Sequence, residues 1–126
     1  IRQRKFIEAY RSLDNGKTWN YEGQPAPETG GNPPHLIRLR DGRLVLVYGY
    51  RLKSYGIRAR ISSDKGKTWS REIILRKDGG NWDLGYPRSA ERPDGKVVTV
   101  YYFNQAAGKE RFIGATIWDP DDVPTQ

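Results

Sequence analysis

The sequence contains no cysteine and no methionine, and its only histidine is His35. Without cysteine the chain forms no disulfide bond and offers no thiolate, either as a nucleophile or as a metal ligand. One histidine cannot build a histidine-rich metal centre, so we expect neither a metal site nor a cofactor. The absence of cysteine does not decide between cellular compartments.

Long hydrophobic runs are also missing. No apolar stretch approaches the roughly 18 residues that a membrane-spanning helix requires, and no signal-like hydrophobic region opens the chain, so we expect no membrane partner. Hydrophobic residues make up 36% of the 126 residues, which is enough for one compact core. The 14 glycines are spread along the chain, as in proteins with many short strands and turns.

Dense basic runs are absent, although the formal net charge is +7. Lysine and arginine alternate with other residues, as in residues 38–40 and 58–60. This pattern is typical of solvated or site-lining charge; an anionic sugar ligand is a second explanation and nucleic acid a third. Because the planar guanidinium suits carboxylates, we predict an acidic saccharide partner and no nucleic acid.

One eight-residue pattern occurs twice, fifty residues apart: residues 12–19 and 62–69 both read Ser-x-Asp-x-Gly-Lys-Thr-Trp. The spacing predicts a tight turn, because the Asp carboxylate accepts turn N–H groups and Gly supplies a positive φ. The hydroxyls can close the same turn, and Trp can anchor it in the core. The alternate positions after Asp hold Gly and Thr, which excludes a calcium loop. The structural residues of the pattern are Ser12, Asp14, Gly16, Thr18, Trp19, Ser62, Asp64, Gly66, Thr68 and Trp69.

These residues resemble the Asp-box of the sialidase (neuraminidase) superfamily of BNR-repeat proteins. The resemblance implies an all-β fold, a β-propeller of four-stranded antiparallel blades in which each box joins the third and fourth strands of a blade. A repeat of about fifty residues suits propeller blades. The motif indicates the fold and is weak evidence for catalysis, because non-catalytic propellers of the family also contain it.

The chain divides into parts of successive blades. We predict the end of one blade in residues 1–22, a complete blade in 35–76, three strands of the next in 86–118, and a tail in 119–126. The Asp-Gly turns at 41–42 and 94–95, between alternating apolar runs, are strong hairpin signals. A little over two blades cannot close a ring. We therefore expect a single partial propeller, similar to the C-terminal portion of a longer sialidase-like protein, with missing blades supplied by a longer chain or by self-association.

Because successive strands of a blade are antiparallel, their connections lie alternately at the two ends of the blades. The boxes and the Asp-Gly turns lie at one end, so the loops between strands two and three and the connections between blades lie at the other, where the family has its active site. The residues gathered there are Glu28, Asn32, His35, Tyr50, Arg51, Lys53, Tyr55, Arg58, Asn81, Trp82, Asp83, Tyr86 and Arg88.

Sialidases use a tyrosine nucleophile, since an anionic sugar repels a carboxylate. In the family this tyrosine opens the first strand of the last blade, before an Asp-Gly hairpin. Tyr86 holds the matching place, and the resemblance implies that it is the catalytic residue. Pro87 replaces the usual serine, so a packing or sugar-stacking role for Tyr86 stands as the alternative.

The family also grips the substrate carboxylate with three arginines. Arg58 best matches one of them, although Arg60 shares its side of the strand. Arg51 is a second candidate, and Arg88 a third unless it pairs with Glu91 or Asp83. We expect Arg51, Arg58 and Tyr86 to face one concavity, with Trp82 and Tyr55 contributing to sugar binding.

Asp83 and Glu28 match no family motif, and we expect them to stabilise turns. His35 is expected to be a hydrogen-bonded rim residue. The acid/base aspartate, the glutamate partner and a further arginine of the family have no match in these residues. Two hypotheses follow. In the first, the chain is part of a glycoside hydrolase that acts on sialic acid or a related acidic glycan, and this chain alone is inactive. In the second, it is part of a non-catalytic propeller that binds carbohydrate or protein. The resemblance implies a secreted or extracytoplasmic location.

Overall fold

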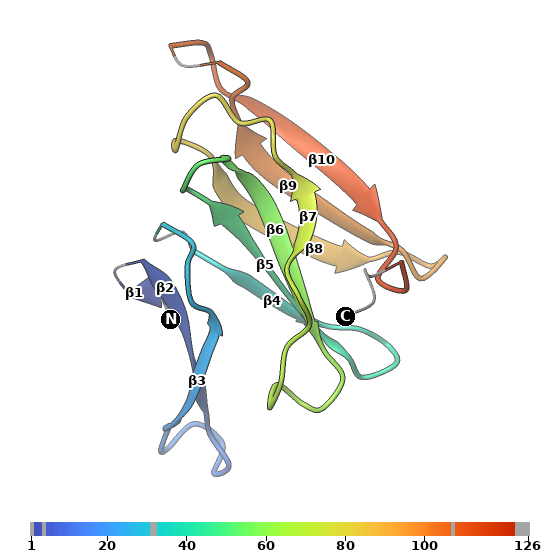
Figure 1. The fold of residues 1–126 in the computed structure, drawn as a ribbon. Helices are drawn as coiled ribbons and strands as arrows, with labels where there is room; N and C mark the ends of the chain where they lie inside the picture. The colour runs from blue at the N-terminus through green and yellow to red at the C-terminus, as the bar shows by residue number, and fades with distance from the viewer. Residues whose placement is uncertain (1, 4, 31–32, 107, 123–126) are drawn as a thin grey trace.

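The computed structural model describes residues 2–3, 5–30, 33–106 and 108–122, and these contain ten strands and no helix. The strands form three antiparallel sheets, one after another along the chain (Figure 1). The first sheet has the order β1-β2-β3, the second β4-β5-β6-β7 and the third β10-β9-β8. The strands are β1 (Arg2–Gln3), β2 (Phe6–Arg11), β3 (Asn20–Ala26), β4 (His35–Arg38), β5 (Leu44–Tyr50), β6 (Gly56–Ser62), β7 (Ile73–Arg76), β8 (Gly85–Glu91), β9 (Val97–Phe103) and β10 (Phe112–Trp118).

Two strand boundaries differ from those predicted. β3 continues through residues 23–26, beyond residue 22, where the first part of a blade was predicted to end. β3 pairs with β2 alone among the described strands, and an outer strand tolerates Pro25, which has no N–H to donate. β8 begins at Gly85, earlier than the predicted strand, because a register shift between Gly85 and Arg88 accommodates Tyr86 and Pro87.

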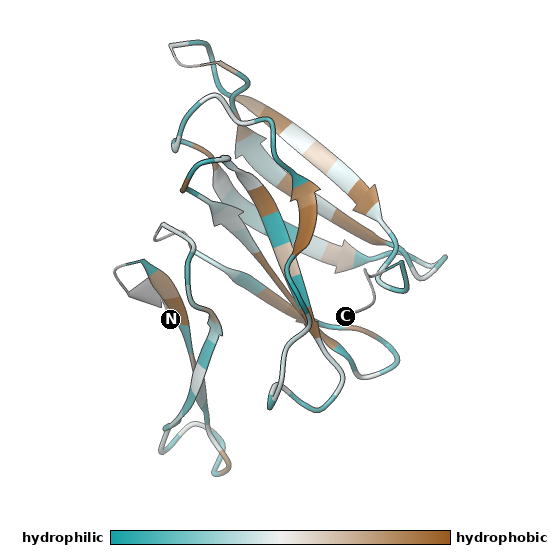
Figure 2. Ribbon diagram, in the orientation of Figure 1, coloured by the Kyte–Doolittle hydropathy of each residue, from teal (hydrophilic) through white to brown (hydrophobic). Residues whose placement is uncertain are grey.

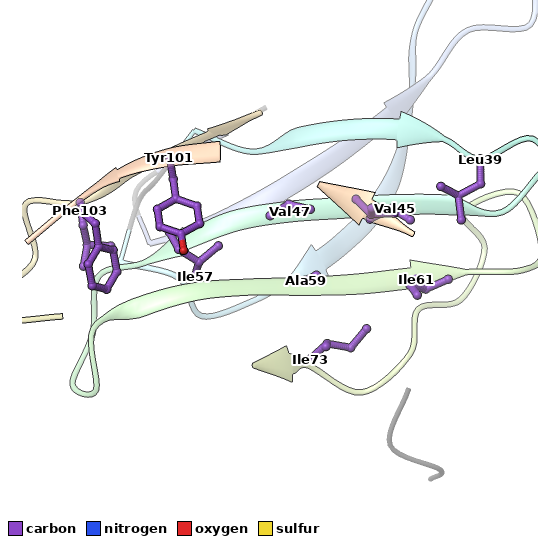
Figure 3. Close-up of a cluster of buried hydrophobic side chains, with 11 residues drawn as sticks. Leu39, Val45, Val47, Ile57, Ala59, Ile61, Ile73, Tyr101 and Phe103 are labelled. Atoms are coloured by element: carbon purple, nitrogen blue, oxygen red, sulfur yellow. The ribbon is translucent and has the colours of Figure 1, made fainter. Parts of the chain in front are cut away.

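The main core lies between the second and third sheets. Alternate residues of β5 and β6 contribute buried side chains to it, and in Figure 3 Tyr101 and Phe103 of β9 lie near Ile57 of β6. In Figure 2 most hydrophobic residues lie in the strands, and the connecting turns are mostly hydrophilic. The buried residues of this cluster are Leu39, Val45, Val47, Ile57, Ala59, Ile61, Ile73, Leu84, Val97, Tyr101 and Phe103.

The opposite face of the second sheet turns toward the first sheet. There Leu46 and Tyr48 of β5 pack with Ile7 and Ala26, and Trp69 lies against this smaller cluster. Successive residues of β5 therefore serve two different interfaces, as the alternation of side chains along a strand requires.

The connections separate to the two ends of the sheets, as the topology predicts. Figure 1 shows the β2–β3 and β6–β7 turns at one end and the loops after β5, β7 and β9 at the other. We call the second end the loop face and define it by residues 27–30, 51–55, 77–84 and 104–106.

Candidate functional site

Each Asp-box closes its turn with the same hydrogen bonds. The carboxylate of Asp64 accepts the Thr68 N–H at 2.8 Å and the Thr68 hydroxyl at 2.5 Å. The Ser62 hydroxyl accepts the Gly66 N–H at 2.8 Å, and Gly66 has φ +86°. Lys65 also has a positive φ, of 62°, so two successive left-handed residues make the turn. The bonds of the first box are equivalent.

The two boxes differ in how their tryptophans pack. Trp69 lies against the cluster between the first and second sheets, whereas Trp19 is 61% exposed. The Trp19 indole N–H donates to the Gly16 carbonyl at 3.1 Å, so Trp19 braces its own turn. The prediction that the tryptophan anchors the turn in the core is thus correct for Trp69 and wrong for Trp19.

On the loop face, Asn104 fixes the connection that carries the candidate site. Asn104 is fully buried, and its side-chain amide donates to the Asn81 side chain at 3.0 Å and to the Asp83 carbonyl at 2.7 Å. Its side-chain oxygen accepts the Asn81 N–H, and its backbone carbonyl accepts the Gly80 N–H. The 77–84 connection therefore has a fixed shape, which projects Trp82 and Asp83 from the loop face.

Arg51 lies at the centre of the exposed aromatic side chains of this face. Its guanidinium carbon is 5.6 Å from the centre of the Trp82 ring and 5.8 Å from that of Tyr86. Nε donates to the Leu84 carbonyl at 3.2 Å, and Nη2 donates to the Tyr102 hydroxyl at 3.2 Å. Arg51 makes no salt bridge with a carboxylate among the described residues. The structure thus brings Arg51, Trp82 and Tyr86 together, three of the residues selected from the sequence.

Tyr86 is held in an unusual backbone conformation. Its φ is +49°, in the left-handed region that a bulky residue rarely adopts, and it follows Gly85 at φ +122°. This geometry turns the ring outward, 52% exposed, with its centre 5.8 Å from that of Tyr102. Among the described residues, no carboxylate accepts a hydrogen bond from the Tyr86 hydroxyl.

The carboxylate of this face pairs with a different tyrosine. Asp83 accepts the Tyr102 hydroxyl at 2.8 Å through one oxygen and Arg111 at 2.7 Å through the other. The Tyr102 hydrogen bond, followed by that of Arg111, lowers the pKa of Asp83. Burial and the Asp83 hydrogen bond raise the pKa of the Tyr102 phenol. Asp83 therefore stays ionised and Tyr102 stays neutral near neutral pH.

Sequence reasoning missed Tyr102 and Arg111. The partners of Asp83 come from positions 19 and 28 residues away, which no local motif links. One signal was available: both residues lie beside a connection at the end opposite the boxes, the criterion that gathered the other loop-face candidates.

Arg58 does not join this site, and the expectation that it shares a concavity with Arg51 and Tyr86 is wrong. Arg58 is 4% exposed and pairs with Glu72, with 3.3 Å between Nε and Oε1. Its guanidinium donates to the Ser54 and Arg76 carbonyls, and its carbon lies 4.8 Å from the centre of the Tyr50 ring.

The physical reason is strand parity. Arg58 pairs in register with Tyr48, and both belong to the face of the second sheet that turns toward the first sheet. Arg51 is an even number of residues from Val45 and Val47, so it continues the side of the sheet on which these two residues face the third sheet. Residues at the same ends of neighbouring strands thus point to opposite faces.

The other candidates have separate positions. Arg88 is exposed and donates to the Pro87 carbonyl; the carboxylates of Glu91 and Asp83 have other partners. The Nδ1 atom of His35 accepts the Ser89 N–H at 2.9 Å, and this bond links β4 to β8. Tyr55 packs against the main core. Glu28 lines a small cavity of about 200 Å³ with Tyr48, Arg60 and Glu72. Burial and the charge of Arg88 lower the pKa of His35. Asn32 lies outside the described residues.

The described residues contain no cluster of three or more His, Cys, Asp or Glu side chains that could hold a metal ion. In the same part of the chain, no helix long and apolar enough to cross a membrane is found.

The family model of the BNR repeat-like domain matches residues 2–99, which hold both boxes. The chain belongs to the BNR repeat-like family. The resemblance to the BNR-repeat superfamily and the all-β, propeller-like fold are therefore confirmed. The chain is similar to a protein of unknown function from Dyadobacter fermentans, with 41% identity and a TM-score of 0.72. That similarity covers 87% of this chain, which spans 30% of the length of the solved structure. The search of curated proteins finds no match.

Proposed function

We propose that the loop face of this BNR repeat segment binds an acidic saccharide, as part of a sialidase-like glycoside hydrolase. The observation that carries the proposal is the placement of the Arg51 guanidinium between two exposed rings, 5.6 Å from the centre of Trp82 and 5.8 Å from that of Tyr86. A guanidinium offers a carboxylate paired N–H donors, and flat aromatic faces pack against the C–H surface of a sugar ring.

The electrostatics of the cluster support an anionic ligand. Arg111 balances the charge of Asp83, whereas Arg51 has no carboxylate at salt-bridge distance among the described residues. Nε and Nη2 of Arg51 are held by Leu84 and Tyr102, and Nη1 makes no hydrogen bond within the described part of the chain. The side chain is therefore fixed in place while it keeps donors for a ligand, an arrangement that reduces the entropy cost of binding.

The same geometry favours a second candidate, a non-catalytic saccharide-binding propeller. Cleavage of a glycosidic bond by a tyrosine nucleophile needs a base beside the hydroxyl. The Tyr86 hydroxyl has no such partner in the described residues, and Arg58 is committed to Glu72. In this candidate the segment supplies saccharide recognition and no catalytic step.

Titration with the α-methyl glycoside of N-acetylneuraminic acid, followed by NMR, tests the proposal. Trp82 is 58% exposed, so Trp82→Ala leaves the fold intact. We expect it to weaken binding about tenfold, with Trp82→Phe close to the parent, because stacking contributes on the order of 1 kcal/mol. Arg51→Gln should abolish the preference for the sialoside over uncharged methyl galactoside, while the matched control Arg71→Gln should not. Equal affinity of all variants for both sugars would contradict the proposal.

A further inference from the structure

The Arg51 guanidinium has one edge bound to the protein and another edge free. Nε donates to the Leu84 carbonyl and Nη2 donates to the Tyr102 hydroxyl, each at 3.2 Å. These two donors share one edge of the guanidinium, whereas Nη1 makes no hydrogen bond within the described part of the chain. Because the guanidinium is a rigid planar fork, two bonds along one edge fix the direction of the next. The terminal edge, formed by Nη1 and the second N–H of Nη2, therefore remains for a ligand.

The backbone of Arg51 is also held in place. Its N–H donates to the Thr29 carbonyl at 2.8 Å. Gly30 lies so close that a Cβ atom there would be 2.7 Å from the Arg51 Cβ, and Gly30 has φ +75°, so only glycine suits this position. With the backbone and Nε held, the bond to the Tyr102 hydroxyl sets the plane of the guanidinium.

The proton of the Tyr102 hydroxyl is directed away from Arg51. The hydroxyl donates to Asp83 at 2.8 Å, and a tyrosine has one O–H to donate, so its oxygen faces Arg51 as an acceptor. The Asp83 carboxylate polarises this O–H, which strengthens the bond that the oxygen accepts from Arg51. Asp83 is itself fixed, because its carboxylate pairs with Arg111 at 2.7 Å and its backbone carbonyl accepts the buried Asn104 amide at 2.7 Å.

We propose that Tyr102 is a positioning residue, which holds Arg51 so that the terminal Nη1–Nη2 edge of its guanidinium receives the carboxylate of the ligand. This inference rests on the proposed saccharide-binding function of the loop face. The carboxylate then lies in the plane of the guanidinium and accepts two parallel N–H···O bonds. Tyr102 acts through Arg51 and needs no contact with the ligand.

NMR of the free 126-residue chain tests the positioning without any ligand. Tyr102→Phe removes the hydroxyl and keeps the ring, whose centre is 5.8 Å from that of Tyr86. We expect the Arg51 Nε proton to exchange with water about fivefold faster in this variant than in the parent, because the guanidinium leaves the Leu84 carbonyl more often. Equal exchange in the two proteins would overturn the proposal.

Tyr101→Phe is the matched control on the same strand. The Tyr101 hydroxyl bonds the Thr116 hydroxyl at 2.7 Å and makes no hydrogen bond with Arg51. This variant loses a tyrosine hydroxyl in the core, so it should lower the thermal midpoint while the exchange of the Arg51 Nε proton stays as in the parent. The same acceleration in Tyr101→Phe would show a general loosening of the third sheet and would count against a specific role for Tyr102.

Titration with the α-methyl glycoside of N-acetylneuraminic acid tests the consequence for the ligand. Tyr102→Phe should weaken binding of this sialoside about tenfold and leave the affinity for uncharged methyl galactoside unchanged, because only the carboxylate depends on the direction of Arg51. A loss of the same size for both sugars would overturn the proposal. Faster Arg51 exchange in Tyr102→Phe, together with no binding of the sialoside by the parent, would support the positioning of Arg51 and contradict the proposed function instead.

Discussion

Asp14 and Asp64 make the same hydrogen bonds in different surroundings. Gly66 of the second box is buried and Trp69 packs between two sheets, whereas Gly16 and Trp19 of the first box are exposed. Loss of the turn at Asp64 therefore disturbs packing as well as local structure.

We expect Asp64→Ala to lower the thermal midpoint more than Asp14→Ala, as followed by circular dichroism. Saccharide binding per folded molecule should be the same in both variants, since the boxes lie away from the loop face. Loss of binding in Asp64→Ala with an unchanged thermal midpoint would show that the box is part of the site.

Acid stability should depend on the same carboxylates. The Thr68 side chain and backbone, followed by Ser62, lower the pKa of Asp64 from 3.8 to about 2. A carboxylate with a lower pKa in the folded state stabilises the fold above its unfolded pKa, and this stabilisation is lost as the pH falls toward the folded pKa. Between about pH 4 and pH 2, urea unfolding of Asp64→Asn should thus depend less on pH than that of the parent. Parallel pH profiles would contradict this assignment.

At the scale of elements, β6 and β7 approach too closely for a side chain at Gly56. A Cβ atom there would overlap the Arg76 carbonyl carbon at 2.7 Å, and the carbonyl belongs to a paired strand that cannot shift freely. We expect Gly56→Ala to cost about 1–3 kcal/mol in urea unfolding. Gly95→Asn should cost less, because nothing lies within 4 Å of that position and Asn tolerates its positive φ.

Glu72 of the segment before β7 neutralises a buried cation. It pairs with Arg58 and accepts the Tyr48 hydroxyl at 2.8 Å. Glu72→Ala leaves Arg58 buried without a carboxylate, and we expect a loss of roughly 3 kcal/mol in chemical denaturation. The exposed pair of Arg11 and Glu22 supplies the comparison, since Glu22→Ala should cost under about 1 kcal/mol. Similar losses in the two variants would argue against a role of Glu72 in neutralising the buried Arg58.

Strands and turns were predictable because their causes are local. The Asp-Gly hairpins and the boxes are fixed by residues within eight positions of one another, and the structure has these turns where the sequence places them. Arg58 was misplaced because its face depends on pairing with Tyr48, a fact about register that no motif carries. The Asp83 pairs with Tyr102 and Arg111 depend on how the third sheet folds back on the 77–84 connection, which is likewise non-local.

At the scale of the whole molecule, we expect no hydrolysis of a sialoside by the 126-residue chain alone. Cleavage requires a proton donor for the leaving group and a nucleophile at the anomeric carbon, and residues that act as a unit fail together when one is missing. The described loop face offers Arg51 and Tyr86 without a base for the tyrosine. A fluorogenic sialoside assay, with light scattering to determine mass, measures this. Turnover by a monomer would show that the catalytic set is complete within this chain.

The hydrogen bonds of Arg51 also connect the three sheets with one another. The Thr29 N–H donates to the Lys5 carbonyl at 2.8 Å, the Arg51 N–H donates to the Thr29 carbonyl at 2.8 Å, and the Arg51 side chain donates to Leu84 at 3.2 Å. These bonds connect the first, second and third sheets in series across the loop face. These bonds add to the packing of the two buried clusters, and Arg51 is the residue that is bonded to both outer sheets. A ligand bound to the Arg51 side chain would therefore restrain the residue that these bonds share.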